Sequence, residues 1–171
     1  MNAETFIGLG GNQGAVGETF GRALSKMKAF ASLEKSSSLY RSKPFGFPDQ
    51  PDFLNAVVKV KTDLSPLALL GRLQEIEDEL GKEVVRENGP RTIDLDLLLY
   101  GDLELESTEL LLPHPGIVKR DFVLMPLAEI EPELIHPTLN RSTRDLLSDG
   151  FDSHYVFATE KTPFSRVDLE T

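Results

Sequence analysis

The chain has 171 residues, 40% of them hydrophobic, and no cysteine. This length predicts one domain with a core of its own, and the missing cysteine excludes disulfides, thiolate metal sites and thiol nucleophiles. The formal net charge of −10, from 18 Lys+Arg against 28 Asp+Glu, argues against nucleic acid as a partner. Any metal is therefore expected to have oxygen or imidazole ligands, as suits Mg²⁺.

The first elements alternate between strand and helix patterns. Residues 5–9 are a short apolar run that stops at glycines, which predicts a buried strand. Apolar residues at helical spacing predict a helix over 16–30, and a second strand is expected to end near 39–40. Three prolines and a glycine in 42–51 then predict a loop.

The middle of the chain repeats this pattern. Alternating apolar residues over 53–61 predict a strand with one apolar face. Ser65 and Pro66 are typical of the N-cap and first position of a helix, and Gly81 is typical of its end. The residues expected on the buried stripe of this helix are Leu67, Leu70, Leu73, Ile76 and Leu80.

Four further segments follow. Residues 93–100 read as a strand and 110–112 as a further short strand. Residues 120–130 read as a helix that Pro126 loosens, and 131–150 as turns with a short helix. The order β-α-β-β-α-β predicts an α+β fold of the ferredoxin-like sandwich type, with helices on one face of a mostly antiparallel sheet.

We expect a domain over 1–150 and a C-terminal extension over 151–171 whose role the sequence does not indicate. No run of about 18 apolar residues occurs, so no membrane partner is expected. The N-terminal residues lack the basic and apolar regions of a secretory signal. We therefore expect a cytoplasmic protein.

Asp94 and Asp96 are the strongest chemical signal. Residues two apart in a strand share a face, so the two carboxylates should point the same way. Two like charges that close raise each other's pKa, and a divalent cation relieves the conflict. The alternative is two unrelated acids at a solvent-facing strand. The residues expected on the opposite, core-facing side are Ile93, Leu95, Leu97 and Leu99.

Basic residues precede this acid pair. Arg91 follows the rigid Gly89-Pro90 turn, and Lys82 and Arg86 lie upstream. Cations beside paired carboxylates are what ATP chemistry requires, because they contact the phosphate oxygens that metal ions bridge.

Two other motifs are less specific. The glycine cluster over 8–14 lacks the spacing of a dinucleotide fingerprint, and we expect it to form a tight strand-to-helix turn. His114 lies in a stiff turn between two prolines and could donate to a phosphate or ribose, or be purely structural.

Several aromatic residues lie at loop or element ends. Two of them could sandwich a flat heterocycle, with Asn55 offering a donor and an acceptor to its edge. Ordinary core packing is the alternative for each ring. The four candidates are Phe45, Phe47, Phe53 and Phe122.

The segment Gly-Pro-Arg-Thr-Ile-Asp-Leu-Asp-Leu-Leu-Leu-Tyr-Gly, residues 89–101, resembles the signature of the 6-hydroxymethyl-7,8-dihydropterin pyrophosphokinase (HPPK) family. The likeness extends, in the same order, over most of residues 5–135. The further matching segments are 40–46, 49–57, 113–115 and 120–127.

This resemblance implies a ferredoxin-like fold, with 1–150 as the pyrophosphokinase domain. It implies transfer of the β,γ-pyrophosphoryl group of ATP to the hydroxymethyl group of the dihydropterin in folate biosynthesis, with release of AMP. Asp94 and Asp96 would hold two Mg²⁺ ions, and Arg91 and Lys82 would be catalytic. The partners would be small molecules alone, and we expect a monomer.

The resemblance also implies the substrate contacts. Phe53 and Phe122 would stack on the two faces of the pterin, and Asn55 would bind its edge. Groups at Ser42, Lys43 and Phe45 would complete the pterin pocket. The residues implied near the nucleotide are Gln74, Glu77, Arg86, His114 and Arg120.

The chain departs from the family pattern around the nucleotide. Lys82 stands where the family usually has an arginine, and lysine lacks the planar fork. The remaining departures are Glu87, Asn88 and Glu109. They motivate an alternative, a pterin- or nucleotide-binding homologue without activity. A ferredoxin-like RNA-binding domain is a third possibility, which the charge of −10 disfavours.

Overall fold

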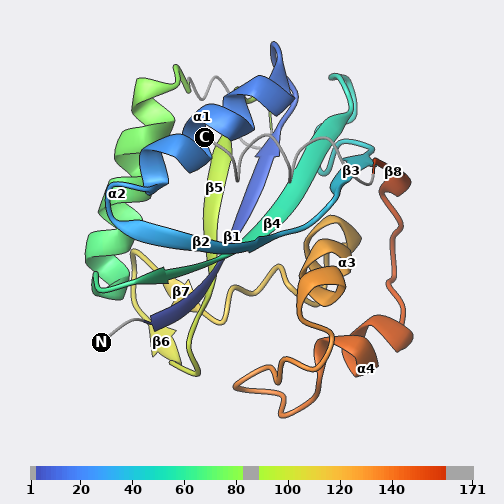
Figure 1. Cartoon of the computed structure of the whole chain (residues 1–171). Coiled ribbons are helices and arrows are strands. Elements are labelled where there is room, and N and C mark those ends of the chain that lie inside the picture. Colours follow the sequence, from blue (N-terminus) through green and yellow to red (C-terminus); the bar gives the residue numbers. More distant parts are fainter. Residues whose placement is uncertain (1–2, 83–88, 161–171) are drawn as a thin grey trace.

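The computed structural model describes residues 3–82 and 89–160. Its main sheet has six strands in the order β5-β1-β4-β3-β8, with β2 also paired to β4, and β6 and β7 form a separate two-stranded sheet (Figure 1). The elements are β1 (Ala3–Gly11), α1 (Val16–Met27), β2 (Ala31–Ser36), β3 (Leu39–Ser42), β4 (Phe53–Thr62), α2 (Pro66–Glu79), β5 (Asp94–Tyr100), β6 (Leu105–Glu106), β7 (Leu111–Leu112), α3 (Asp121–Ile130), α4 (Thr143–Ser148) and β8 (Val156–Glu160).

All pairings in the main sheet are antiparallel, so the predicted α+β class is confirmed. The central strand β1 pairs with β4 on one side and β5 on the other. The second strand that we expected to end near residue 40 is in fact two strands, β2 and β3. Ser37 interrupts them and donates its backbone N–H to the carbonyl of Val57.

Helices α1 and α2 cover one face of the sheet and enclose the larger core, as the apolar alternation predicts. Phe20 of α1 and Leu69 and Leu73 of α2 are completely buried there. Ser65 caps α2 as expected, because its hydroxyl accepts from the N–H of Ala68 at 3.3 Å. The predicted stripe was wrong at Leu67, which is 48% exposed.

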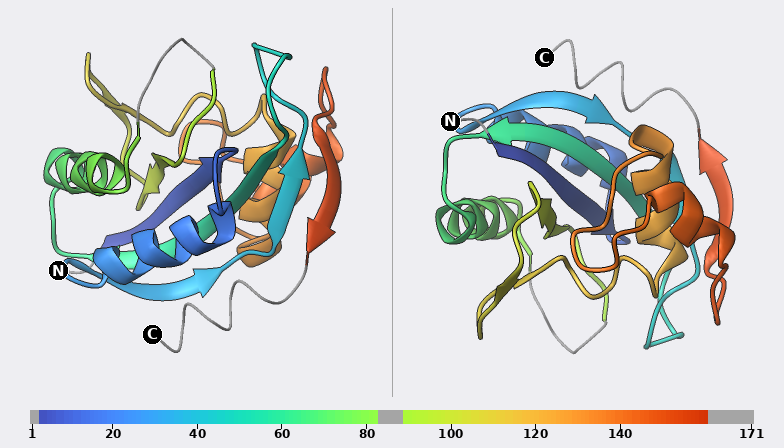
Figure 2. Two further views of the ribbon diagram at one scale, coloured as in Figure 1. Left: turned by 90° about the horizontal axis from the view of Figure 1, so that it is seen from above. Right: turned by 90° about the horizontal axis from the view of Figure 1, so that it is seen from below.

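The opposite face of the sheet is also covered, by α3 and then α4 (Figure 2). The expectation of helices on one face was therefore incomplete. Val57 of β4 and Leu98 of β5 point to this side, where they pack with Leu124 and Leu127 of α3. The strands are thus apolar on both faces because each face has a helical layer.

One residue of β5 faces the side opposite to that predicted. The register of β1 and β5 shifts between Phe6 and Ile7, which lie opposite Leu99 and Leu97. This bulge leaves Leu98 as an extra residue and breaks the two-residue alternation. Leu99 consequently packs on the α3 side together with Leu98.

The glycine cluster was also assigned incorrectly in part. Gly8, Gly10 and Gly11 belong to β1, and only Gly14, with φ of 73°, has the left-handed backbone of a turn. A Cβ on Gly11 would lie 2.6 Å from the carbonyl oxygen of Thr92. Glycine therefore lets β1 approach the segment that leads into β5.

The C-terminal extension contributes a strand to the main sheet. β8 pairs antiparallel with β3, with Arg41 opposite Ala158. Within the described part of the chain, no helix has the length and hydrophobicity to span a membrane.

We predict that Gly11→Ala lowers the free energy of unfolding by about 1–3 kcal/mol, because backbone atoms cannot yield to the added methyl group. Gly71→Ala is the matched control, since a Cβ there meets nothing within 4 Å. In mid-helix it should stabilise the protein by about 0.5–1 kcal/mol. Urea unfolding of both variants measures the difference, and equal effects would contradict the close approach.

Candidate functional site

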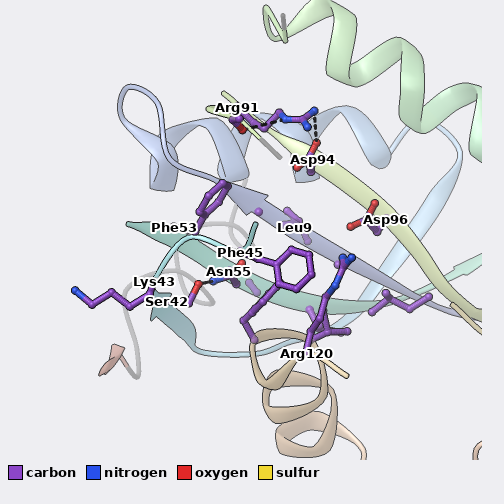
Figure 3. A pocket seen from close by; sticks show the side chains of 18 residues that line it. Leu9, Ser42, Lys43, Phe45, Phe53, Asn55, Arg91, Asp94, Asp96 and Arg120 are labelled. Carbon is purple, nitrogen blue, oxygen red and sulfur yellow. Dashed lines mark hydrogen bonds and ion pairs between the residues drawn. The ribbon is translucent and has the colours of Figure 1, made fainter. Parts of the chain in front are cut away.

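A hollow among the described residues lies on the α3 side of the sheet (Figure 3). Its floor is formed by β1, β4 and β5, and its rim by the 42–51 loop and the start of α3. Gly8 and Gly10 lie in the floor, where the absence of side chains leaves space. The predicted site residues that line this hollow are Ser42, Lys43, Phe45, Phe53, Asn55, Arg91, Asp94, Asp96, Arg120 and Phe122.

A second hollow adjoins the first along β5. It is lined by Leu70 of α2, by the 107–111 segment and by His114. Asp96 lines both hollows. The two hollows therefore meet at Asp96, one of the two acids that the sequence singled out.

The acids on β5 are balanced by fixed cations. Asp94 Oδ1 lies 2.7 Å from Lys82 Nζ and 3.9 Å from Arg91 Nη1. Lys82 Nζ also lies 3.1 Å from Glu77 Oε2, which in turn accepts from the N–H of Leu95 at 2.7 Å. Burial tends to lower the pKa of Lys82, but the carboxylates of Asp94 and Glu77 outweigh it and raise that pKa. Lys82 is therefore held as a cation.

Asp96 is exposed within the hollow, whereas protein surrounds its other sides. This enclosure is the largest cause of a rise in the pKa of Asp96 to about 6, and the charge of Asp94 adds to it. Two oxygen-bearing acids on one strand face form a donor set that suits Mg²⁺. Nearby cations oppose the rise in pKa, namely Arg120, Lys82 and Arg91.

Asn12 is a connecting residue that sequence reasoning missed. It is 8% exposed, and its Oδ1 accepts from the backbone N–H of Arg91 at 2.9 Å. Its Nδ2 donates to Gln50 Oε1 and to the carbonyl of Pro51, both at 2.9 Å. Asn12 thus joins the Arg91 segment to the loop at the rim. A lone asparagine after a strand gave no distinctive signal of this role.

The amide of Asn55 is fixed from behind the hollow. The side chain is 5% exposed, and Nδ2 donates to the carbonyl of Tyr40 at 3.1 Å and to Ser42 Oγ at 2.9 Å. With both N–H groups so placed, Oδ1 is the atom left near Gly10, 3.5 Å from the position of a Cβ there. The hollow therefore has a fixed acceptor in its floor.

Aromatic rings gather at the rim. Phe45 and Phe122 have centroids 6.4 Å apart, and each also contacts Tyr155. The guanidinium of Arg120 lies 4.6 Å from the centroid of Phe45. Phe53 lies across the hollow from this group in Figure 3. Aromatic faces thus border the hollow on both sides, as expected for a site that takes a flat ligand.

The remaining predicted residues lie outside this arrangement to different degrees. The side chain of Lys43 points away from the hollow in Figure 3 and lies 3.7 Å from Asp52, so only its backbone borders the site. Gln74 is exposed on α2 and is absent from the linings of both hollows. Arg86 lies outside the described residues, as do Glu87 and Asn88.

His114 is held neutral. Its Nδ1 accepts from the N–H of Gly116 at 2.9 Å, so the proton lies on Nε2. Burial lowers its pKa to about 4, and the charge of Arg120 lowers it further. His114 is thus a hydrogen-bond donor without charge at the second hollow. In the described residues 3–82 and 89–160, no three His, Asp or Glu side chains converge on one point.

We predict that His114 titrates near pH 4, the value to which burial lowers its pKa. NMR of the imidazole nitrogens should show the Nε2–H tautomer at pH 7. Unfolded histidine gains its proton near pH 6.5, so the unfolded state binds more protons between these values and stability falls as the pH decreases. The non-titrating His114→Gln variant should lose less stability over this range, by at most about 1.4 kcal/mol per pH unit. Titration of His114 above pH 6 would contradict the assignment.

Comparison with known proteins agrees with this geometry. The model of the family 7,8-dihydro-6-hydroxymethylpterin-pyrophosphokinase (HPPK) matches residues 6–132. A 2-amino-4-hydroxy-6-hydroxymethyldihydropteridine pyrophosphokinase of Aquifex aeolicus is 41% identical over 143 residues, covering 84% of this chain and 89% of that protein. A protein of the same name from Synechocystis is 43% identical over 143 residues, with 82% and 73% covered.

Solved structures show the same fold. A crystal structure of Plasmodium falciparum HPPK-DHPS with pterin and p-hydroxybenzoate aligns with a TM-score of 0.71 at 17% identity, covering 87% of this chain. The chain spans 43% of the length of that protein. From the family match and the identity to full-length relatives, the chain belongs to the 7,8-dihydro-6-hydroxymethylpterin-pyrophosphokinase family.

Proposed function

We propose that the chain transfers the β,γ-pyrophosphoryl group of ATP to the hydroxymethyl group of 6-hydroxymethyl-7,8-dihydropterin, in folate biosynthesis. The observation that carries this proposal is the position of Asp96, which lines both an aromatic hollow and an adjoining hollow that also contains His114. Two substrates that react with each other need two sites that meet at the reacting groups. Family membership supports the same reaction.

The aromatic hollow takes the dihydropterin. Phe53 and Phe122 stack on the two faces of the bicyclic ring, and the fixed Oδ1 of Asn55 accepts a hydrogen bond from a ring-edge N–H. Backbone groups at Ser42 and Lys43 complete this wall, since both residues line the hollow. Glycines in β1 leave the ring space to reach the sheet.

The adjoining hollow and the acids take ATP. Asp94 and Asp96 would hold two Mg²⁺ ions, which when bound would offset the charge of the polyphosphate. Arg91 contacts the transferred phosphates, and Arg120 adds positive charge on the α3 side. His114 donates from Nε2 without bringing a charge. Glu77 positions Lys82 through the 3.1 Å contact between Oε2 and Nζ.

In this arrangement the pterin hydroxyl attacks the β-phosphorus of ATP in line. A bond forms between the hydroxyl oxygen and the β-phosphorus, and the bond to the oxygen bridging the α and β phosphorus atoms breaks. AMP leaves with that oxygen, and the hydroxyl proton is released. The protein supplies position and electrostatic stabilisation, which account for most of the acceleration in such reactions.

AMP formation from ATP and hydroxymethyl-dihydropterin with Mg²⁺ tests the proposal directly. The departures Lys82, Glu87 and Glu109 favour, as a second candidate, a homologue that binds without turnover. Glu109 supports this candidate because it places an acid in the lining of the second hollow. Pterin binding without AMP release would support that candidate and exclude the enzyme.

We predict that Asp96→Ala lowers kcat on the order of 100- to 1,000-fold, the usual effect of losing one electrostatic contact in the transition state. Pterin binding should survive, because Phe53, Phe122 and Asn55 remain in place. Asp102→Ala is the matched control, since this exposed acid follows β5 and lines neither hollow. AMP release retained by Asp96→Ala would contradict the metal assignment.

We predict that Asn12→Ala lowers kcat by about tenfold, as expected for about 1.4 kcal/mol of lost positioning. The variant removes the acceptor for the Arg91 N–H and the link to Gln50 and Pro51. Steady-state kinetics and a melting curve check it. An unchanged kcat would show that Arg91 is positioned without Asn12.

A further inference from the structure

Residues of the C-terminal extension lie directly behind the aromatic rim of the hollow. Val156 of β8 pairs with Ser42 of β3, and the N–H of Lys43 donates to the carbonyl of Tyr155 at 2.9 Å. Ser42 and Lys43 both line the hollow. The extension thus supports the backbone that borders the heterocycle.

A buried carboxylate ties the same segment to α3. Asp121 is 2% exposed, and its Oδ2 accepts from the N–H of Tyr155 at 2.8 Å and of Val156 at 3.0 Å. Asp121 is also the first residue of α3, where a negative charge is favourable, and it directly precedes Phe122. The side chain of Asp121 therefore links the start of β8 to the first turn of α3, which carries Phe122.

The ring of Tyr155 completes a cluster of three. Its centroid lies 5.6 Å from Phe45 with the planes at 65°, and 5.9 Å from Phe122 with the planes at 85°. These are the edge-to-face geometries that aromatic pairs prefer. Each ring contacts the other two, so one ring cannot turn freely while the others stay in place. Tyr155 is not part of the lining itself and acts through Phe45 and Phe122.

From these contacts we infer that residues 151–160 complete the dihydropterin site and that Tyr155 is a positioning residue for it. Tyr155 holds Phe45 and Phe122 in place before the substrate arrives, so less side-chain freedom is lost on binding. The inference rests on the proposed function and adds to it a role for the extension. Tyr155 affects the affinity for the dihydropterin and leaves the affinity for ATP unchanged.

The test compares Tyr155→Ala, Tyr155→Phe and Phe157→Ala. Phe157 is the matched control, because it lies two residues further along the chain in β8, is 52% exposed and has its ring 4.8 Å from Lys43 Nζ. Tyr155→Ala should raise the KM for dihydropterin roughly three- to tenfold, the fold-change that corresponds to lost aromatic pairing. The KM for ATP and kcat should stay unchanged. Tyr155→Phe and Phe157→Ala should behave as wild type.

A direct binding measurement accompanies the kinetics. Isothermal titration with 6-hydroxymethylpterin, in the presence of Mg²⁺ and α,β-methylene ATP, should show the same loss of affinity. Tyr155→Leu keeps apolar volume and replaces the alanine variant if that variant does not fold. Unchanged pterin affinity in Tyr155→Ala or Tyr155→Leu would overturn the inference. So would an equal effect of Tyr155→Phe, or a parallel loss of ATP affinity and melting temperature.

Failure of the proposed function would look different. A wild-type protein that neither binds 6-hydroxymethylpterin nor releases AMP would exclude the reaction itself, before any variant is compared. A wild-type protein that passes both tests, with Tyr155→Ala indistinguishable from it, would leave the reaction in place and remove the role of the extension.

Discussion

Two carboxylates on one face of β5 repel each other, and the arrangement of the site follows from the need to offset this repulsion. Asp94 is paired with Lys82 at 2.7 Å, and Asp96 has its raised pKa moderated by cations from the Arg91 segment and from α3. Each cation belongs to a different segment, so the charge balance requires the whole fold. A polyphosphate would meet a surface where both signs of charge are already in place. Catalysis then needs little rearrangement of the protein's own dipoles.

The second constraint is room at the sheet. A strand normally carries a side chain on each face, and the α3 side of β1 would be filled if Gly8 and Gly10 had them. The same side of β4 carries Asn55, whose amide is fixed by Tyr40 and Ser42. A flat ligand can therefore reach a sheet that elsewhere is covered by α3. Binding of the ligand thus depends on the fold, because the part of the sheet that α3 leaves uncovered is also the part where Gly8 and Gly10 carry no side chains.

Much of this could be predicted from periodicity and motif. Most of the elements up to α3, the cap at Ser65 and the shared face of Asp94 and Asp96 follow from local rules, since strand alternation and helix capping depend on near neighbours. The face of Leu99 could not be predicted, because the bulge in β5 is set by its pairing with β1. The roles of Asn12 and Tyr155 depend on contacts with residues far along the chain, such as Asn12 with Arg91. No local pattern encodes such contacts.

The position of β1 in the middle of the sheet has a consequence for biosynthesis. Thr5 pairs with both Val60 and Tyr100. Strand β1 is therefore synthesised before β4 and β5, the two strands with which it pairs. Contacts of such long sequence separation slow folding and leave strand edges open in the interval. The rings at the rim come together only after β8 has been synthesised. The nascent chain therefore contains Asp94, Asp96, Gly8 and Gly10 before it can enclose a ligand. During that interval its unpaired strand edges are most accessible to chaperones and most prone to aggregation.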